Sequence, residues 1–189
     1  AKGTYLMFVD ADDYVTDDFW PSISRATNKS FDFVLFNYLS VSNGKSIEIA
    51  PSKSLLSITD MQKYILECKS NSPWARLYRS DLVKSVFFPE GQSLGEDLIF
   101  NLRYLYKAKS FLYLDEAVYA YATNDTSRMS KSASELDALD YRKMYQELMS
   151  FCNRCSFGDD EIQVTRAAMR RIISNYAARS VREGNSSKV

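Results

Sequence analysis

Three carboxylates, Asp10, Asp12 and Asp13, fall within four positions directly after an apolar run over residues 5–9. The run is rich in aromatic and branched side chains, which predicts a buried strand. In open α/β sheets, ligands bind at the carboxyl ends of the strands. Because clustered carboxylates repel one another, a divalent cation with oxygen ligands is the simplest group to neutralise them. On an extended backbone Asp10 and Asp12 share one side, and Asp13 takes the other.

A second acidic pair, Glu96 and Asp97, follows Gly95 at a predicted loop-to-helix junction. Free N–H groups at a helix N-terminus stabilise a carboxylate, and this is a purely structural explanation for the pair. The functional interpretation is a general base. Because the chain contains no histidine, an aspartate such as Asp97 is the natural group to take a proton from an attacking hydroxyl.

Cationic and aromatic side chains are interleaved over residues 74–79, next to a break at Pro73. Trp74 and Arg76 in this segment predict a surface that stacks on rings and holds phosphate. A strand edge with solvated arginines is the alternative. The aromatic residues 119–121 continue into a polar loop over 124–132, for which a cleft border and an ordinary surface loop both remain open.

Composition restricts the possible functions. The 189 residues, 46% hydrophobic and 25% charged, are enough for one domain with a sizeable core. Without histidine, His-dependent triads and His metal ligands are excluded. The balance of 24 basic and 24 acidic residues argues against a nucleic-acid partner. Three cysteines do not make an even disulfide framework, so we expect a reducing compartment.

Hydrophobic periodicity and end signals predict the elements that position these groups. Asn43 and Gly44 indicate a hairpin turn, and residues 158–159 indicate the turn of a C-terminal helical hairpin. Strands are expected over residues 4–9, 31–41, 45–49, 74–78 and 110–121. Helices are expected over residues 16–27, 59–68, 80–84, 96–107, 134–157 and 159–182. This pattern predicts an α/β fold.

Taken together, these motifs resemble family 2 glycosyltransferases, inverting enzymes with a GT-A fold. The matching segments are residues 1–13, 74–78, 95–101 and 118–121, followed by Ser127 and Ser130. The family usually carries Lys where Arg76 stands. The resemblance covers residues 1–130 and implies a mixed sheet flanked by helices, in the truncated form of a nucleotide-diphospho-sugar transferase. The family's N-terminal nucleotide-binding half has no counterpart, so we expect a C-terminal portion with sequence missing upstream, divided into domains 1–132 and 133–189.

The resemblance implies transfer of a sugar from a nucleotide-sugar donor, a UDP-sugar, to the hydroxyl of a glycan or lipid-linked acceptor in polysaccharide biosynthesis. It implies a Mn²⁺ or Mg²⁺ ion held by Asp12, the main metal contact, and Asp10, which also places the nucleotide sugar. By the same resemblance Asp13, Arg76 and Trp74 belong to the donor site. Asp97 is implied as the catalytic base, with Glu96 beside it.

Two other interpretations remain open. An aspartyl-phosphate-type phosphatase would use Asp10 as nucleophile and Asp12 as acid/base, although Tyr14 stands where that class expects Thr or Val. In the second interpretation the chain is a non-catalytic binding module, which is inactive without the missing half. We expect a cytoplasmic location, with contact at the inner face of the membrane left open.

Overall fold

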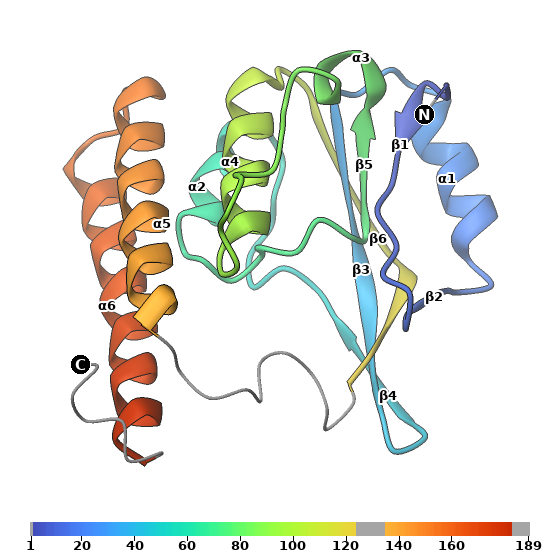
Figure 1. The fold of residues 1–189 in the computed structure, drawn as a ribbon. Helices are drawn as coiled ribbons and strands as arrows, with labels where there is room; N and C mark the ends of the chain where they lie inside the picture. Colours follow the sequence, from blue (N-terminus) through green and yellow to red (C-terminus); the bar gives the residue numbers. More distant parts are fainter. Residues whose placement is uncertain (1, 124–134, 183–189) are drawn as a thin grey trace. The chain divides into compact units, whose positions relative to one another are not determined.

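The computed structural model describes residues 2–123 and 135–182. Within these residues the strands form one six-stranded mixed sheet, and the α/β class is as predicted (Figure 1). The strands are β1 (Tyr5–Leu6), β2 (Tyr14–Val15), β3 (Phe33–Ser42), β4 (Lys45–Ile49), β5 (Arg76–Arg79) and β6 (Phe111–Ala122). The helices are α1 (Phe19–Thr27), α2 (Ile58–Ile65), α3 (Ser80–Val83), α4 (Glu96–Lys107), α5 (Glu135–Arg154) and α6 (Asp159–Arg182).

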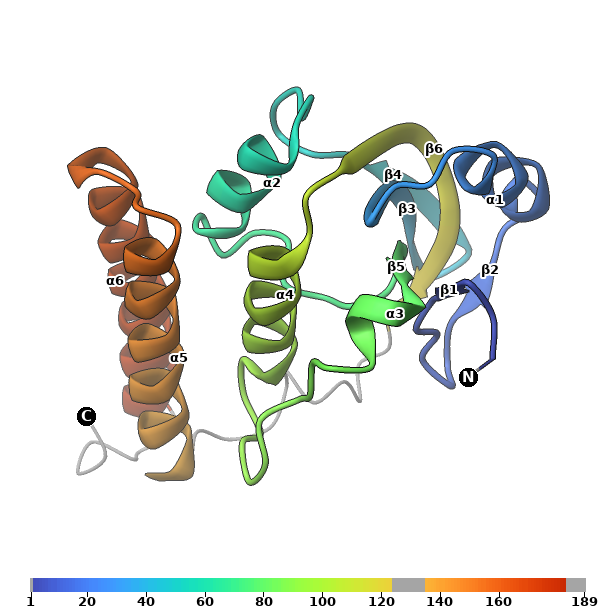
Figure 2. The same ribbon diagram turned by 90° about the horizontal axis from the view of Figure 1, so that it is seen from above.

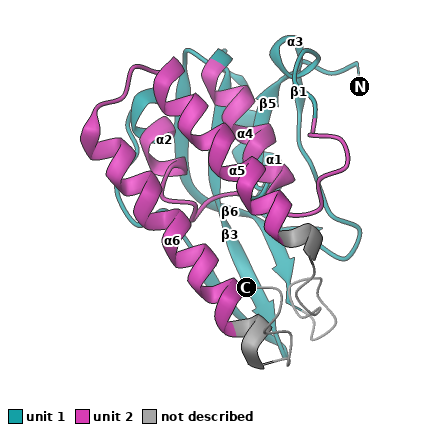
Figure 3. Ribbon diagram, turned by 60° about the vertical axis from the view of Figure 1, so that its left-hand side comes forward, with its two compact units in different colours: residues 1–61, 72–87, 107–126 teal, residues 62–71, 88–106, 127–189 magenta. Residues whose placement is uncertain are grey.

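The chain folds into two compact units, each assembled from several segments (Figure 3). Unit 1 comprises residues 1–61, 72–87 and 107–126 and contains the sheet, α1 and α3. Unit 2 comprises residues 62–71, 88–106 and 127–189 and contains nearly all of α4 together with α5 and α6. The predicted division into domains 1–132 and 133–189 stays a prediction, because residue 132 lies outside the described residues.

Strand β3 is the centre of unit 1. It pairs with β5 and β4 in antiparallel fashion and with β6 in parallel, in the order β1-β5-β3-β6-β2. The consecutive apolar residues Phe33 to Phe36 are all buried, as expected for a strand covered on both faces. Asn43 and Gly44 both have positive φ, and they form the predicted hairpin turn between β3 and β4.

The strand that leads into the acidic residues lies at an edge of the sheet. Tyr5 and Leu6 pair with β5, and Phe8 makes one isolated bridge to Trp74. Within residues 2–123, β1 has a neighbouring strand on one side only. Its apolar residues are therefore half-buried, and Val9 is 50% exposed. The prediction of a buried strand over 4–9 is wrong, because an apolar run reports burial potential and not the number of neighbouring strands.

In unit 2, the predicted helical hairpin is formed by α5 and α6, which run side by side (Figures 1 and 2). At the turn, the N–H of Gly158 donates to Oε2 of Glu161 at 3.1 Å. The buried residues of these two helices include Leu148, Phe151 and Met169. In the part of the chain that is described, no helix has the length and apolar character needed to cross a membrane.

Candidate functional site

The acidic turn at residues 10–13 is fastened to the carboxyl end of β6. The N–H of Asp13 bonds to the carbonyl of Asp10 at 3.2 Å and closes the turn. The N–H of Asp10 donates to the hydroxyl of Tyr119 at 3.1 Å, and that hydroxyl donates to Oδ2 of Asp13 at 2.5 Å. Oδ1 of Asp13 accepts the N–H of Ala122 at 2.8 Å. Asp13 was predicted to contact the nucleotide-sugar donor, but both of its carboxylate oxygens bond to β6 and hold the turn.

Tyr119 is completely buried and is the hub of this arrangement. Burial, and after it the hydrogen bond to Asp13, raises the pKa of Tyr119, so the phenol keeps the proton that it donates. Sequence reasoning named Tyr119 only within the aromatic segment 119–121, as part of a matching segment and of a candidate cleft border. The signal for its role was its place near the end of a strand, two residues from another tyrosine.

Asp10 and Asp12 are exposed, in contrast to Asp13. Partial desolvation, followed by the charges of Asp13 and Asp12, raises the pKa of Asp10. Such mutual repulsion is relieved by a cation. Among the described residues, no group of three or more acidic or cysteine side chains could enclose a metal ion. Two carboxylates nevertheless suit Mg²⁺ or Mn²⁺, because such ions are commonly held by one or two carboxylates, with phosphate and water as the other ligands.

Trp74 and Arg76, predicted to form a surface for rings and phosphate, lie in the core of unit 1. Trp74 is 8% exposed and stacks on Tyr119 at 4.9 Å and on Tyr121 at 5.2 Å between ring centroids. Arg76 is 2% exposed, and its guanidinium lies 5.9 Å from the ring centroid of Phe33. Neither the surface nor the alternative of solvated arginines describes Trp74 and Arg76, because both side chains are buried, while Arg79 at the end of β5 is half-buried.

The second acidic pair, Glu96 and Asp97, occupies the first turn of α4, as predicted. Both side chains are half-buried. This pair belongs to unit 2, whereas the acidic turn at residues 10–13 belongs to unit 1. The predicted polar loop, with Ser127, Arg128 and Ser130, lies outside the described residues.

The loop that leads into Glu96 is attached to α5 by Asp140. Oδ2 of Asp140 accepts the N–H of Ser93 at 2.8 Å and that of Leu94 at 3.0 Å. The side-chain amide of Gln92 also donates to the carbonyl of Leu94 at 2.7 Å. Asp140 is 4% exposed, so its carboxylate is stabilised by the hydrogen bonds it accepts.

Sequence reasoning missed Asp140, although the sequence contained a signal. Asp140, Met144 and Leu148 are spaced by four residues and form one stripe of α5, in which Asp140 is the single charged member. Gly95 lies against the same stripe, with a φ of +74°. A Cβ at Gly95 would lie 2.5 Å from the sulfur of Met144. The position before Glu96 therefore requires glycine both for backbone conformation and for space.

No family model matches the chain. It is 24% identical over 193 residues to the uncharacterized glycosyltransferase EpsJ of Bacillus subtilis, covering 94% of this chain and 56% of EpsJ. It is 28% identical over 141 residues to the poly(ribitol-phosphate) β-N-acetylglucosaminyltransferase TarS of Staphylococcus aureus, covering 70% of this chain and 23% of TarS.

Among solved structures, TarS residues 1–349 in complex with UDP-GlcNAc resembles the chain with a TM-score of 0.66 at 20% identity. The likeness covers 95% of this chain and 52% of the TarS chain. A structure of the same TarS segment with UDP gives a TM-score of 0.63. The chain therefore has the fold of part of TarS, which confirms the predicted fold class, and it spans about half the length of EpsJ and of this TarS segment.

Proposed function

We propose that this protein takes part in the transfer of a sugar from a nucleotide-sugar donor, a UDP-sugar, to a hydroxyl of a glycan or lipid-linked acceptor. The observation that carries the proposal is the agreement between relatives named glycosyltransferases and the fold of TarS, which was solved in complex with UDP-GlcNAc. In the finer form of the proposal, the protein works as a family 2 enzyme, inverts the anomeric centre and depends on a divalent metal. We place the reaction in the cytoplasm.

On the donor side we assign Asp12 and Asp10. They are the exposed carboxylates of the acidic turn, while Asp13 is occupied with β6. A bound Mn²⁺ or Mg²⁺ would stabilise the negative charge of the leaving diphosphate. The two aspartates would hold that ion, and the bonds of the Tyr119 hydroxyl, which accepts the N–H of Asp10 and donates to Asp13, would keep the turn in one orientation.

On the acceptor side we assign Asp97 as the general base. It would take the proton of the acceptor hydroxyl as the hydroxyl oxygen bonds to the anomeric carbon and the bond to the diphosphate breaks. Glu96 is its neighbour in the first turn of α4. Direct displacement of this kind inverts the configuration at the anomeric carbon.

The test uses UDP-GlcNAc as probe, with Mn²⁺ present, absent or removed by EDTA. Donor binding is measured by calorimetry and turnover by release of UDP, for the parent chain, Asp12→Asn and Asp97→Asn. Asp12→Asn is expected to lose metal-dependent donor binding. Asp97→Asn is expected to bind donor as the parent does and to lose turnover. Asp17→Asn, which changes an exposed carboxylate beyond the acidic turn, is the control.

Each outcome separates the candidate functions. If the affinity for UDP-GlcNAc is unchanged both by EDTA and by Asp12→Asn, the metal assignment is wrong. Equal turnover by Asp97→Asn and the parent would remove the base assignment. Donor binding without turnover in any variant would identify the chain as a binding module. The relatives favour a transferase over the predicted phosphatase alternative.

A further inference from the structure

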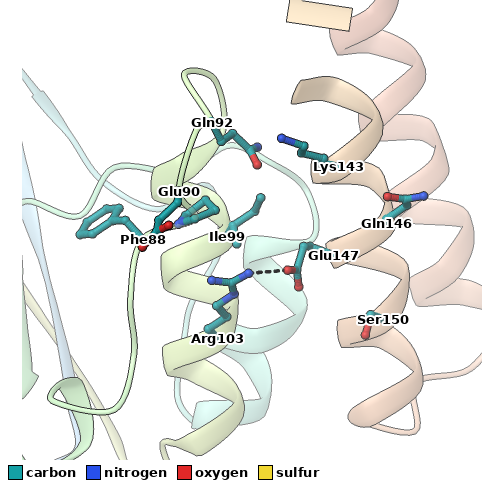
Figure 4. A pocket seen from close by; sticks show the side chains of 10 residues that line it. Phe88, Glu90, Gln92, Ile99, Arg103, Lys143, Gln146, Glu147 and Ser150 are labelled. Carbon is teal, nitrogen blue, oxygen red and sulfur yellow. Dashed lines mark hydrogen bonds and ion pairs between the residues drawn. The ribbon is translucent and has the colours of Figure 1, made fainter. Parts of the chain in front are cut away.

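A pocket of about 610 Å³ lies within unit 2, between the loop that precedes α4, α4 itself and α5 (Figure 4). This volume is within the range of small-molecule binding sites in proteins. The assignments made above do not use its lining residues, and the pocket therefore needs an explanation of its own.

One wall of the pocket is a row of polar side chains on α5. Lys143, Gln146 and Ser150 line it and are spaced by three and four residues, which places them on one face of the helix (Figure 4). All three are exposed. Together they offer an ammonium donor, an amide that donates and accepts, and a hydroxyl that does both. Gln92 adds an amide oxygen from the opposite loop, since its amide nitrogen already donates to the carbonyl of Leu94.

Apolar side chains line the opposite side of the pocket. They are Phe88, Pro89 and Ile99. The ring of Phe88 stacks on Phe100 with centroids 4.3 Å apart and an angle of 8° between the planes. Phe88 is 37% exposed and lies at the margin of the pocket, with its ring directed away from α5 (Figure 4).

The charges of the lining residues cancel. Arg103 of α4 and Glu147 of α5 form an ion pair of 2.6 Å (Figure 4). Lys143 and Glu90 add one charge of each sign. A phosphate or carboxylate would find no excess of positive charge here. A neutral ring with several hydroxyls matches this lining, because the polar row bonds the hydroxyls and Pro89 and Ile99 offer apolar contact.

We propose that this pocket binds a neutral glycan segment, one or two sugar residues of the acceptor chain. The acceptor identity rests on the proposed function. Ile99 and Arg103 lie on the face of α4 that starts at Glu96, whereas Asp97 is about 100° further round the helix. Because Asp97 lies on another face of α4, the pocket would hold a part of the acceptor chain other than the sugar whose hydroxyl reacts.

The experiment is a titration of the ¹⁵N-labelled 189-residue chain with cellobiose, maltose and diacetylchitobiose, followed in amide spectra. At about 10 mM sugar, even millimolar affinity gives measurable occupancy. We expect at least one disaccharide to shift amides of residues 88–92 and 143–150. The double variant Lys143→Ala/Gln146→Ala should bind with an affinity at least about tenfold lower than that of the parent, since it loses two hydrogen-bonding groups. Arg142→Ala, an exposed neighbour outside the lining, should bind like the parent.

The proposal is overturned if none of the three disaccharides shifts these amides, or if the shifts persist unchanged in the double variant. UDP-GlcNAc with Mn²⁺, titrated into the same samples, tests the donor side separately. Shifts by sugar without any response to donor would retain the pocket and reject the transferase. A response to donor with no response to the disaccharides would reject the pocket alone. The dispersion of the spectra shows that each variant is folded.

Discussion

The phenolic O–H of Tyr119 donates a 2.5 Å hydrogen bond to the carboxylate of Asp13. The ring of Tyr119 is in turn stacked on Trp74 with only 2° between their planes. The aromatic core of unit 1 therefore fixes the direction in which the acidic turn presents its two exposed carboxylates. A polar turn at the surface takes its geometry from rings that are themselves buried.

Tyr119→Phe should separate this positioning from simple packing. The variant keeps the ring but leaves the N–H of Asp10 without its acceptor and Asp13 without its strongest donor. We expect a loss of about 1–3 kcal/mol in the free energy of unfolding, measured by urea denaturation. We also expect weaker metal-dependent binding of UDP-GlcNAc by calorimetry. Tyr121→Phe is the control, because Tyr121 also stacks on Trp74 but is outside this hydrogen-bond network. Equal losses in the two variants would contradict the role assigned to the hydroxyl.

Asp12→Ala should affect donor binding more than stability, whereas Asp13→Ala should lower stability. Asp12 is exposed, so its removal should change stability by less than about 0.5 kcal/mol while donor binding is lost. Asp13 accepts bonds from Tyr119 and Ala122, so its removal should lower stability by about 1–3 kcal/mol. Urea denaturation and donor titration on the same samples measure both. If Asp12→Ala is the less stable of the two, the division of labour within the turn is incorrect.

Asp140→Ala should loosen the approach to the acidic pair of α4. The N–H groups of Ser93 and Leu94 lose their common acceptor, and their amide hydrogen exchange should accelerate. Turnover should fall while the KM for donor stays unchanged, because the loop leads directly into Asp97. Asp140→Asn keeps one carbonyl oxygen and should restore most of the protection. Exchange that is as slow in Asp140→Ala as in the parent would show that the loop is held by other contacts.

Gly95→Ala should destabilise the protein more than Gly91→Ala does. Both glycines have positive φ, so both substitutions carry the backbone penalty of about 1–2 kcal/mol. Only at Gly95 does the new methyl meet another group, the sulfur of Met144 at 2.5 Å, whereas nothing lies within 4 Å at Gly91. The difference in free energy of unfolding isolates the overlap with Met144. Equal values would mean that Met144 moves aside without cost.

Periodicity predicted the elements whose stabilisation is local. The helix at 96–107 and the strand at 45–49 match α4 and β4 to the residue, because caps and turn residues mark their ends. The helix at 159–182 matches α6 in the same way. Strand β2 was not predicted at all, since Tyr14 and Val15 pair only through a distant partner, β6. Long-range pairing leaves little trace in a two-residue segment.

The candidate site was predictable in its residue types and not in its supports. The acidic residues of both clusters were identified because three carboxylates follow an apolar run directly and a second pair follows Gly95 at a predicted helix start. The burial of Trp74 and Arg76 was not, because an alternation of aromatic and basic residues fits a surface and a packed strand equally well. Asp140 is separated from Ser93 by 47 positions, and only the folded chain brings them together.

The close approach of Gly95 to Met144 also bears on how such enzymes can be recombined. A chimera that takes α5 and α6 from a relative would bring a foreign side chain to the position of Met144. Residues 92–95 would then have to be exchanged together with the helices, as a matched pair of segments from one parent. The natural crossover point for shuffling this part of the chain is therefore upstream of Gln92, not between β6 and α5.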